Sequence, residues 1–501
     1  MNDSKFTKIW LGLVTLLATW LRVYNNTSIA LWHDEAFSAL YIKYSWAEMM
    51  QRIILDVHPP LYYFVLRLWH YLFGYSLLSL RSLSILLGVA TVWMGYLFVK
   101  KAFGSTKVAL LAALLLAINP FQIQYALEAR MYTLGTFLLM LSCYLLLFVL
   151  ENPKSKYWIY YGISVAALAY THYFLLFSIV AQGLFVLYYY FIYKKFKISK
   201  IKEYWPALGS YVLAGILYLP WLPSFLEQNS RVQQSYWIPA MDRWSVPTTI
   251  WKLSFGSVEL SRPVYILISI LTVTLLYWFI RNNQNQNKWL VAGSLAVPFL
   301  AAILISLKTA LYLDRYFVFA SIFLSLVAAL TFLNFTRSSN RRLAISLLVI
   351  LSITAFYKNW SDLGVKNLFF ERDTNHKPGM AAAANFVNER AGKDDNIYVG
   401  SSFIFFTFKY YNQTEIKPLL YSTAKVEEIP HFSGTAILTN EDLILSFADT
   451  PRNRTVWLLW TTGFGGNKPL VPGNWRVVQE REFEDSPGFK GKILVTQYFI
   501  N

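Results

Sequence analysis

Two adjacent carboxylates, Asp34 and Glu35, are the residues of this chain best suited to acid–base chemistry, and they lie in the segment LWHDEAFSAL at 31–40. Because neighbouring residues do not share a helix face, one carboxylate can face a site while the protein holds the other. Partial removal from water raises the pKa of a carboxylate and makes it a better general base. The pair could equally be solvated in a loop, or form the N-cap of a helix at 36–44.

Two further polar segments interrupt apolar sequence and could bind a substrate. His58 precedes two prolines, a pattern that is typical of a helix start. Glu128 and Arg130 lie in the segment NPFQIQYALEARMYTLG, and Tyr132 follows Glu128 by four residues, which is the spacing of one helix face. The alternatives are that His58 only marks a helix start, and that Glu128 and Arg130 form a salt bridge at a membrane interface.

The remaining candidates are basic or titratable residues at the ends of apolar runs. His172 lies in AYTHYFLL, while Lys308 and Arg315 flank the start of a later run in LKTALYLDRYF. Basic residues at headgroup depth suit the phosphate of a lipid, and arginine can bind phosphate in bidentate fashion. The alternatives are a structural histidine in a tight turn, and snorkelling of the two basic side chains towards water.

Apolar helices must position all of these residues. The chain has 501 residues, of which 56% are hydrophobic and 15% charged, with a mean hydropathy of +0.38. A soluble domain averages about 25% charged residues. The apolar runs are continuous rather than alternating and approach the ~20 residues that cross a bilayer, which predicts a mainly α, polytopic bundle of membrane helices. We expect eleven spans, at 9–24, 78–99, 108–125, 131–150, 157–171, 174–193, 206–222, 263–280, 289–307, 312–333 and 343–357.

The distribution of basic residues predicts the topology. The segment 58–74 is short and holds His58, Arg67 and His70, so we interpret it as a helix that lies in the membrane interface. With that segment left out and the N-terminus cytoplasmic, nearly every basic cluster lies on the cytoplasmic side. The candidate site residues then share the outer face. The net charge of +17 follows from these clusters, and nucleic acid is not an expected partner.

The composition changes after residue 357. We therefore expect a transmembrane domain at 1–357, with a first outer loop at 25–77, and an extracytoplasmic α/β domain at 358–501. A helix is predicted at 379–391, and strands at 397–399, 435–438, 455–460 and 492–499. The only cysteine, Cys143, lies in an apolar run, which excludes an internal disulfide and a cysteine metal cluster.

In their order along the chain, several segments resemble one family. LWHDEAFSAL, HPPLYYFVLRLWHYLFG, LRSLS, NPFQIQYALEARMYTLG and DRYF are similar to the bacterial branch of the dolichyl-phosphate-mannose protein mannosyltransferases. These are GT-C fold glycosyltransferases, and the lipid A aminoarabinose transferases are their relatives. The resemblance runs from about residue 8 to about residue 335, and its first 140 residues are the most specific. The C-terminal domain is similar only in its placement.

The resemblance implies a membrane glycosyltransferase that moves a mannose-like sugar from a polyprenyl phosphate to an acceptor hydroxyl, with inversion, at the outer face of the plasma membrane. Asp34 then matches the family's essential first-loop acid, and Glu35 is its neighbour. The implied substrate-binding residues are His58, Glu128, Arg130, Tyr132 and His172, and the implied lipid-phosphate contacts are Lys308 and Arg315. The expected partners are the lipid-linked donor, membrane lipids, and an acceptor protein, lipid or glycan of the cell envelope.

Two alternatives and one cofactor question remain open. A transporter or flippase of lipid-linked glycans would place its polar residues near the bilayer midplane, often at broken helices. A membrane anchor would leave binding to the outer domain. The sequence holds no acidic metal-binding motif of the nucleotide-sugar type, but Asp34 and Glu35 could hold a divalent cation.

Overall fold

The computed structural model describes residues 3–501 except 25, 196, 198, 200, 235–236, 257–260, 336–378, 464–465 and 485–490. The chain divides into two compact units. The first, which we call the helical unit, comprises Met1–Tyr24, His58–Val65 and Arg81–Ser361. The second, the sheet unit, comprises Asn25–Val57, Leu66–Leu80 and Asp362–Asn501.

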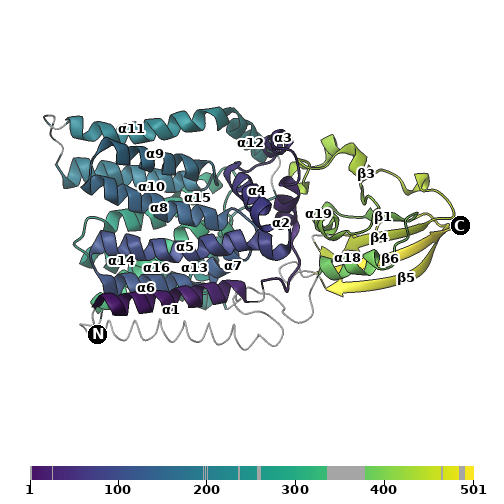
Figure 1. Cartoon of the computed structure of the whole chain (residues 1–501), viewed down its shortest axis with the longest axis horizontal. Helices are drawn as coiled ribbons and strands as arrows, with labels where there is room; N and C mark the ends of the chain where they lie inside the picture. Colours follow the sequence, from purple (N-terminus) through teal and green to yellow (C-terminus); the bar gives the residue numbers. More distant parts are fainter. Residues whose placement is uncertain are drawn as a thin grey trace. The chain divides into compact units, whose positions relative to one another are not determined.

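The helical unit is a bundle of long apolar helices (Figure 1). Within it α9 packs on α8 and α11, α10 packs on α15, and α16 packs on α6 and α15. A π-helix, Tyr188–Tyr193, continues α10, and the 3-10 turns Leu219–Trp221 and Asp314–Phe317 precede α12 and α16. The helices are α1 (Asp3–Val23), α5 (Leu77–Phe103), α6 (Thr106–Ile118), α7 (Pro120–Ala126), α8 (Tyr132–Glu151), α9 (Ser155–Ala169), α10 (Leu175–Leu187), α11 (Ile201–Tyr218), α12 (Leu222–Gln234), α13 (Ser245–Phe255), α14 (Arg262–Asn282), α15 (Lys288–Ser306) and α16 (Val318–Phe335).

In the described part of the chain, eight helices are long and apolar enough to cross a membrane, and the bent pair α6–α7 makes up to nine. The chain is therefore a multi-pass membrane protein, as predicted. The predicted span 157–171 corresponds to α9, whose 15 residues are about 22 Å long. This helix is shorter than the eight that meet the length criterion for a membrane span. The predicted span 343–357 lies outside the described residues.

The segment that we expected to lie in the interface forms helix α4 (Leu61–Phe73). Its 13 residues extend for about 20 Å, which is shorter than the ~30 Å hydrocarbon core. It is not among the helices of the described residues that are long and apolar enough to cross a membrane, and its position in the interface stays a prediction.

A break at Asn119 bends the chain by 57° between α6 and α7. Asn119 caps α7, because its Oδ1 accepts a hydrogen bond from the Gln122 backbone N–H at 2.9 Å, and Pro120 occupies the first helical turn. The carbonyls at the end of α6 have no partner within the helix. Buried Arg22 of α1 donates to two of them, at 2.9 Å (Ala117) and 3.3 Å (Leu116).

The break also fixes the start of α16. The Gln122 side-chain amide donates to the Val318 backbone carbonyl at 2.8 Å and to Ser321 Oγ at 2.7 Å. Asn119 Nδ2 donates to the Leu253 carbonyl at 3.0 Å, which ties the same break to α13. The segment NPFQ therefore ties the end of α13 and the start of α16 to the break before α7. The polar residues at 128–130 and 314–316 lie close to these tied helix ends in the sequence.

The sheet unit is built on a six-stranded mixed sheet of order β3-β2-β1-β4-β6-β5. Strands β1 to β4 pair in parallel, and β6 pairs antiparallel to β4 and to β5. The strands are β1 (Asn396–Val399), β2 (Leu419–Tyr421), β3 (Leu443–Ile444), β4 (Thr455–Thr461), β5 (Trp475–Glu484) and β6 (Lys492–Ile500). Helix α18 (Met380–Asn388) packs on β5 and β6, and α19 (Ser402–Tyr411) packs on β1.

The predicted strand at 435–438 is wrong. This segment is a buried turn that follows the 3-10 helix His431–Ser433. Gly434 adopts a left-handed conformation (φ 90°), which redirects the chain at the start of the apolar residues. A short apolar run does not by itself distinguish a buried strand from a buried turn. The short strands β2 and β3 and the largely exposed β5 were not predicted.

The sheet unit also includes most of the predicted first outer loop. Within it lie α2 (His33–Tyr41) and α3 (Trp46–Leu55), and α2 packs against α19 of the C-terminal residues (Figure 1). The predicted boundary between residues 357 and 358 lies outside the described residues.

Candidate functional site

The predicted acids occupy the first turn of α2. The helix begins at His33 and its N-cap is Trp32, so Asp34 and Glu35 are not the cap of a later helix. The first turn of a helix is a favourable position for negative charge. Glu35 is fully buried and Asp34 is half-buried, so the two adjacent carboxylates face different surroundings.

In the helical unit, His58 and Arg130 lie side by side. Arg130 Nη2 is 3.4 Å from His58 Nε2, and the His58 ring centroid is 6.1 Å from that of His172. A backbone hydrogen bond places His58, because the Leu61 N–H, three residues later, donates to the Tyr170 carbonyl at 3.0 Å. The start of α4 is therefore fastened to the end of α9, two residues before His172.

Three more predicted residues belong to this cluster. Tyr132, at the start of α8, is buried, and its hydroxyl lies within the electrostatic influence of Arg315, Arg130 and Glu128. Glu128 and Arg130 share a tight turn, since the Arg130 N–H donates to the Glu128 carbonyl at 2.8 Å. The structure therefore brings together side chains from the loop before α4, the α7–α8 turn and the start of α16.

His172 is held in one tautomer. Its Nδ1 accepts a hydrogen bond from the Phe174 backbone N–H at 3.1 Å, so in the neutral ring the proton lies on Nε2. Nε2 is buried and has no hydrogen-bond partner among the described residues. Burial, with His58 and Arg130 close by, lowers the pKa of His172 well below its ordinary value. His172 is therefore neutral, and its Nε2–H is a hydrogen-bond donor that has no acceptor among the described residues.

Aromatic rings enclose this histidine. The ring centroids of Tyr316 and Phe319 lie 5.0 Å and 5.2 Å from that of His172, and the Tyr132 centroid lies at 6.2 Å. The imidazole is thus fixed by packing as well as by its hydrogen bond.

Sequence reasoning missed several residues around Arg315. Lys252 Nζ of α13 lies 2.5 Å from Asp314 Oδ2, and the Arg315 guanidinium lies over the Trp237 ring at 5.6 Å from the ring centroid. Asp314 and Tyr316 belong to the quoted segment DRYF, so that motif was the available signal. Lys252 lies 62 residues before Asp314, and no spacing pattern links them.

The structure does not bring Lys308 into this cluster. Its side chain is exposed, and its backbone N–H closes the last turn of α15. Asp34 and Glu35 belong to the sheet unit and the other candidates to the helical unit. A common site for both sets stays a prediction.

Among the described residues, no three or more histidine, cysteine, aspartate or glutamate side chains are grouped so that they could hold a metal ion. Cys143 is buried in α8. A divalent cation at Asp34 and Glu35 stays a prediction.

The family comparison gives one match. Residues 57–223 match the model of the family described as dolichyl-phosphate-mannose-protein mannosyltransferase. These residues hold most of the helical-unit cluster: His58, Glu128, Arg130, Tyr132 and His172. No curated protein matches the chain significantly by sequence.

Solved structures share the fold along the chain. ArnT from Cupriavidus metallidurans in the apo state is 12% identical with a TM-score of 0.62, and 99% of this chain covers 98% of that one. The same protein bound to undecaprenyl phosphate gives 10% identity, the same coverage and a TM-score of 0.59. The archaeal oligosaccharyltransferase AglB from Archaeoglobus fulgidus, in complex with an inhibitory peptide and a dolichol-phosphate, is 12% identical with a TM-score of 0.52.

The overlap with AglB is partial, because 83% of this chain covers 65% of that chain, which is less than two thirds of its length. At these identities the structural likeness establishes the fold. Residues 57–223 are therefore similar to the dolichyl-phosphate-mannose-protein mannosyltransferase family, and the fold of the whole chain is similar to that of ArnT.

Proposed function

We propose that this protein transfers a sugar from a polyprenyl-phosphate carrier to an acceptor hydroxyl at the outer face of the plasma membrane, with inversion at the sugar. The observation that carries the proposal is the cluster in the helical unit, in which Arg130, His58 and His172 converge from three separate segments. The solved relatives bound to undecaprenyl phosphate or to a dolichol-phosphate support a lipid-phosphate donor. A mannose-like sugar is our finer proposal, and the family match supports it.

The phosphate is the leaving group, and its negative charge has to be stabilised as the sugar–oxygen bond breaks. In our proposal Arg130 and Arg315 supply this stabilisation, because an arginine stays charged and can bind phosphate oxygens in bidentate fashion. Glu128 shares a tight turn with Arg130 through its backbone carbonyl, and we assign its side chain to the same donor site. Lys308 is a peripheral contact for lipid headgroups.

The tautomer-locked His172 contributes a hydrogen bond rather than a proton. Its buried Nε2–H is suited to a phosphate or sugar oxygen of the donor, and its low pKa keeps it neutral. Burial of such a donor without a partner costs about 1–3 kcal/mol, and a bound oxygen removes that cost. Tyr132 completes the wall beside it at 6.2 Å between ring centroids.

The acceptor hydroxyl needs a base, since its own pKa is far above neutrality. We assign this role to Asp34, which is half-buried in the first turn of α2, with Glu35 as the buried supporting acid. Direct attack of the acceptor on the sugar, in a single displacement, inverts the anomeric configuration. For the reaction to take place at the outer face, our proposal places the N-terminus in the cytoplasm and the C-terminal domain outside it.

A flippase would use a broken helix whose free backbone groups bind its substrate. The α6–α7 break is such a helix, but Arg22 and Asn119 already satisfy backbone groups on its two sides. This arrangement favours the transferase over the flippase.

The test is a transfer assay with the purified full-length protein. A panel of polyprenyl-phosphate sugars is presented with membrane acceptor fractions, and the acceptors are analysed by mass spectrometry. We expect one donor class to be consumed, with the released polyprenyl phosphate in equal amount. Movement of intact donor across vesicle membranes without transfer would instead support the flippase.

A further inference from the structure

Within the sheet unit, the described part of residues 379–501, which we call the C-terminal domain, contacts the helix that carries the two acids. Phe406 of α19 is the centre of this contact, because its ring centroid lies 5.4 Å from that of His33 and 5.5 Å from that of Phe37. Phe403, one turn earlier in α19, lies 5.4 Å from His33. His33 and Phe37 are one helical turn apart and lie on either side of Asp34 and Glu35 in the sequence.

A hydrogen bond fixes the approach to α2. The Leu31 backbone N–H donates to the hydroxyl of Tyr411, the last residue of α19, at 2.9 Å. Tyr411 is fastened in turn, because its carbonyl accepts a hydrogen bond from Asn388 Nδ2 of α18 at 3.0 Å. The start of α2 is therefore tied to α19 by a hydrogen bond as well as by packed rings.

The turn at Gly434 closes over the same rings. A Cβ at this position would lie 2.2 Å from a Phe406 ring atom and 3.2 Å from a Phe37 ring atom, so no larger residue fits without displacing the pair. With its φ of 90°, Gly434 also holds a conformation that other residues rarely adopt. The turn thus packs directly on the Phe37–Phe406 contact.

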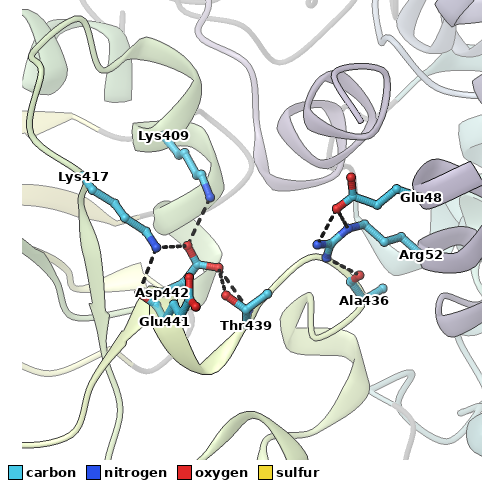
Figure 2. Close-up of polar contacts among 8 residues, drawn as sticks. All are labelled: Glu48, Arg52, Lys409, Lys417, Ala436, Thr439, Glu441 and Asp442. Carbon is cyan, nitrogen blue, oxygen red and sulfur yellow. Dashed lines mark hydrogen bonds and ion pairs between the residues drawn. The ribbon is translucent and has the colours of Figure 1, made fainter. Parts of the chain in front are cut away.

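A polar network holds this turn to the domain and to α3 (Figure 2). Arg52 of α3, paired with Glu48 at 2.9 Å, donates to the Ala436 carbonyl at 3.3 Å. Three residues later Thr439 donates to Asp442 through its backbone at 3.0 Å and through its hydroxyl at 2.9 Å. Lys409 of α19 lies 3.3 Å from the other oxygen of the Asp442 carboxylate.

We propose that the C-terminal domain is the positioning device of the acid-bearing helix, with Phe406, Tyr411 and Gly434 as positioning residues for Asp34. This inference rests on the catalytic role proposed for Asp34. It gives the domain a part in the reaction through the placement of Asp34. A base that is displaced by about 1 Å can lose about a hundredfold in rate, so the packing of α2 sets the turnover number.

The test compares two leucine variants of α19 in the full-length protein. Phe406→Leu removes the ring that contacts His33 and Phe37. Phe405→Leu is the matched control, because Phe405 is equally buried and its ring lies against Phe406 and Lys409. We expect Phe406→Leu to lower kcat about tenfold or more with KM for the donor unchanged, and Phe405→Leu to leave kcat within about twofold.

Hydrogen exchange of the α2 amides provides a readout that does not depend on activity. Phe406→Leu and Tyr411→Phe should both speed exchange at residues 36–41, whereas Phe405→Leu and Tyr398→Phe should not. The Tyr398 hydroxyl lies 3.2 Å from Thr450 Oγ1, inside the domain, so its removal controls for the loss of a buried hydroxyl. Equal effects of the test and control variants on exchange would overturn the positioning role. Faster exchange of α2 with unchanged kcat would instead contradict the catalytic role of Asp34.

Discussion

Arg130 Nη2 lies 3.4 Å from His58 Nε2, although 72 residues separate them in the chain. The guanidinium stays charged and can only donate hydrogen bonds, so Arg130 is the donor of any hydrogen bond between the two side chains. The pair therefore presents the positive charge of Arg130, which is suited to an anionic phosphate.

Replacement of Arg130 tests this role. Arg130→Lys keeps the charge but loses the planar fork, so we expect KM for the lipid-linked donor to rise about tenfold. Arg130→Met should lower kcat/KM further, by about a hundredfold or more, because the leaving phosphate loses a cation. Steady-state kinetics with the donor varied would measure both. Arg281→Lys is the control, since Arg281 bonds only Tyr277 of its own helix among the described residues, and an equal effect there would contradict the assignment.

Asp34→Asn removes the proposed base while keeping the size of the side chain. We expect kcat to fall by about a hundredfold or more with donor binding preserved, because general-base catalysis contributes about 10²–10⁴-fold. The measurement is transfer rate together with binding of a labelled polyprenyl phosphate. Glu389→Gln, at an exposed acid of the C-terminal domain, should be silent. A fully active Asp34→Asn enzyme would exclude Asp34 as the base.

His172→Phe keeps a ring against Tyr316 and Phe319 but removes the buried donor. We expect kcat to fall about a hundredfold to a thousandfold, in the range seen when a single preorganised donor is lost. His172→Gln, which retains an N–H donor, should recover part of the loss. Because the lowered pKa keeps His172 neutral, the pH dependence of the rate should have the same shape in wild type and in His172→Gln. A pH-dependent limb that is present in wild type and lost in His172→Gln would mean that His172 exchanges a proton.

Asp442 makes the sheet unit sensitive to acid. Burial alone would raise its pKa, but Lys409, the Thr439 hydrogen bonds and Lys417 outweigh that effect and hold the pKa below the ordinary value of 3.8. The folded pKa is therefore lower than the unfolded one, so the stabilisation is complete above 3.8 and is lost as the pH falls through the lowered folded pKa. Hydrogen exchange of residues 434–442 in Asp442→Asn should exceed that of wild type at pH 7, and lowering the pH to about 3 should reduce the difference. A difference that does not depend on pH would contradict this account.

Arg22→Met tests the break between α6 and α7. The substitution keeps much of the apolar stem but leaves the carbonyls of Leu116 and Ala117 without their donor, at a cost of about 1–3 kcal/mol for each buried group. We expect a lower thermal midpoint in detergent and a loss of transfer activity that follows the loss of folded protein. Arg22→Lys should recover part of both. An unchanged midpoint in Arg22→Met would show that the break does not depend on this arginine.

The bundle could be predicted from the sequence because each span is a continuous apolar run, a local signal that the later chain does not alter. The candidate cluster of His58, Glu128, Arg130 and His172 was also accessible, since polar residues are rare at such positions. Lys252 could not be found, because its partner Asp314 lies 62 residues away and only folding brings them together.

The same physical reason explains why the association of α2 with the C-terminal domain was missed. The Leu31–Tyr411 hydrogen bond joins residues that are 380 positions apart, and neither residue type signals it. The strand predicted at 435–438 was wrong because one left-handed glycine turned an apolar run that otherwise has strand composition. Local sequence patterns therefore predict the helices and strands, whereas the contacts between distant residues arise only on folding.

The bonds of Arg22 have a consequence for how the protein is made. Its acceptors at Leu116 and Ala117 lie 94 and 95 residues further along the chain. At a synthesis rate of about 5–20 residues per second, roughly 5–20 seconds pass between the emergence of Arg22 and that of its acceptors. During that interval the Arg22 guanidinium of α1 lacks the two carbonyl acceptors that it has in the folded protein. The arrival of α6 then supplies the two carbonyl acceptors of Arg22, which ties the pairing of α1 with α6 to the first quarter of chain synthesis.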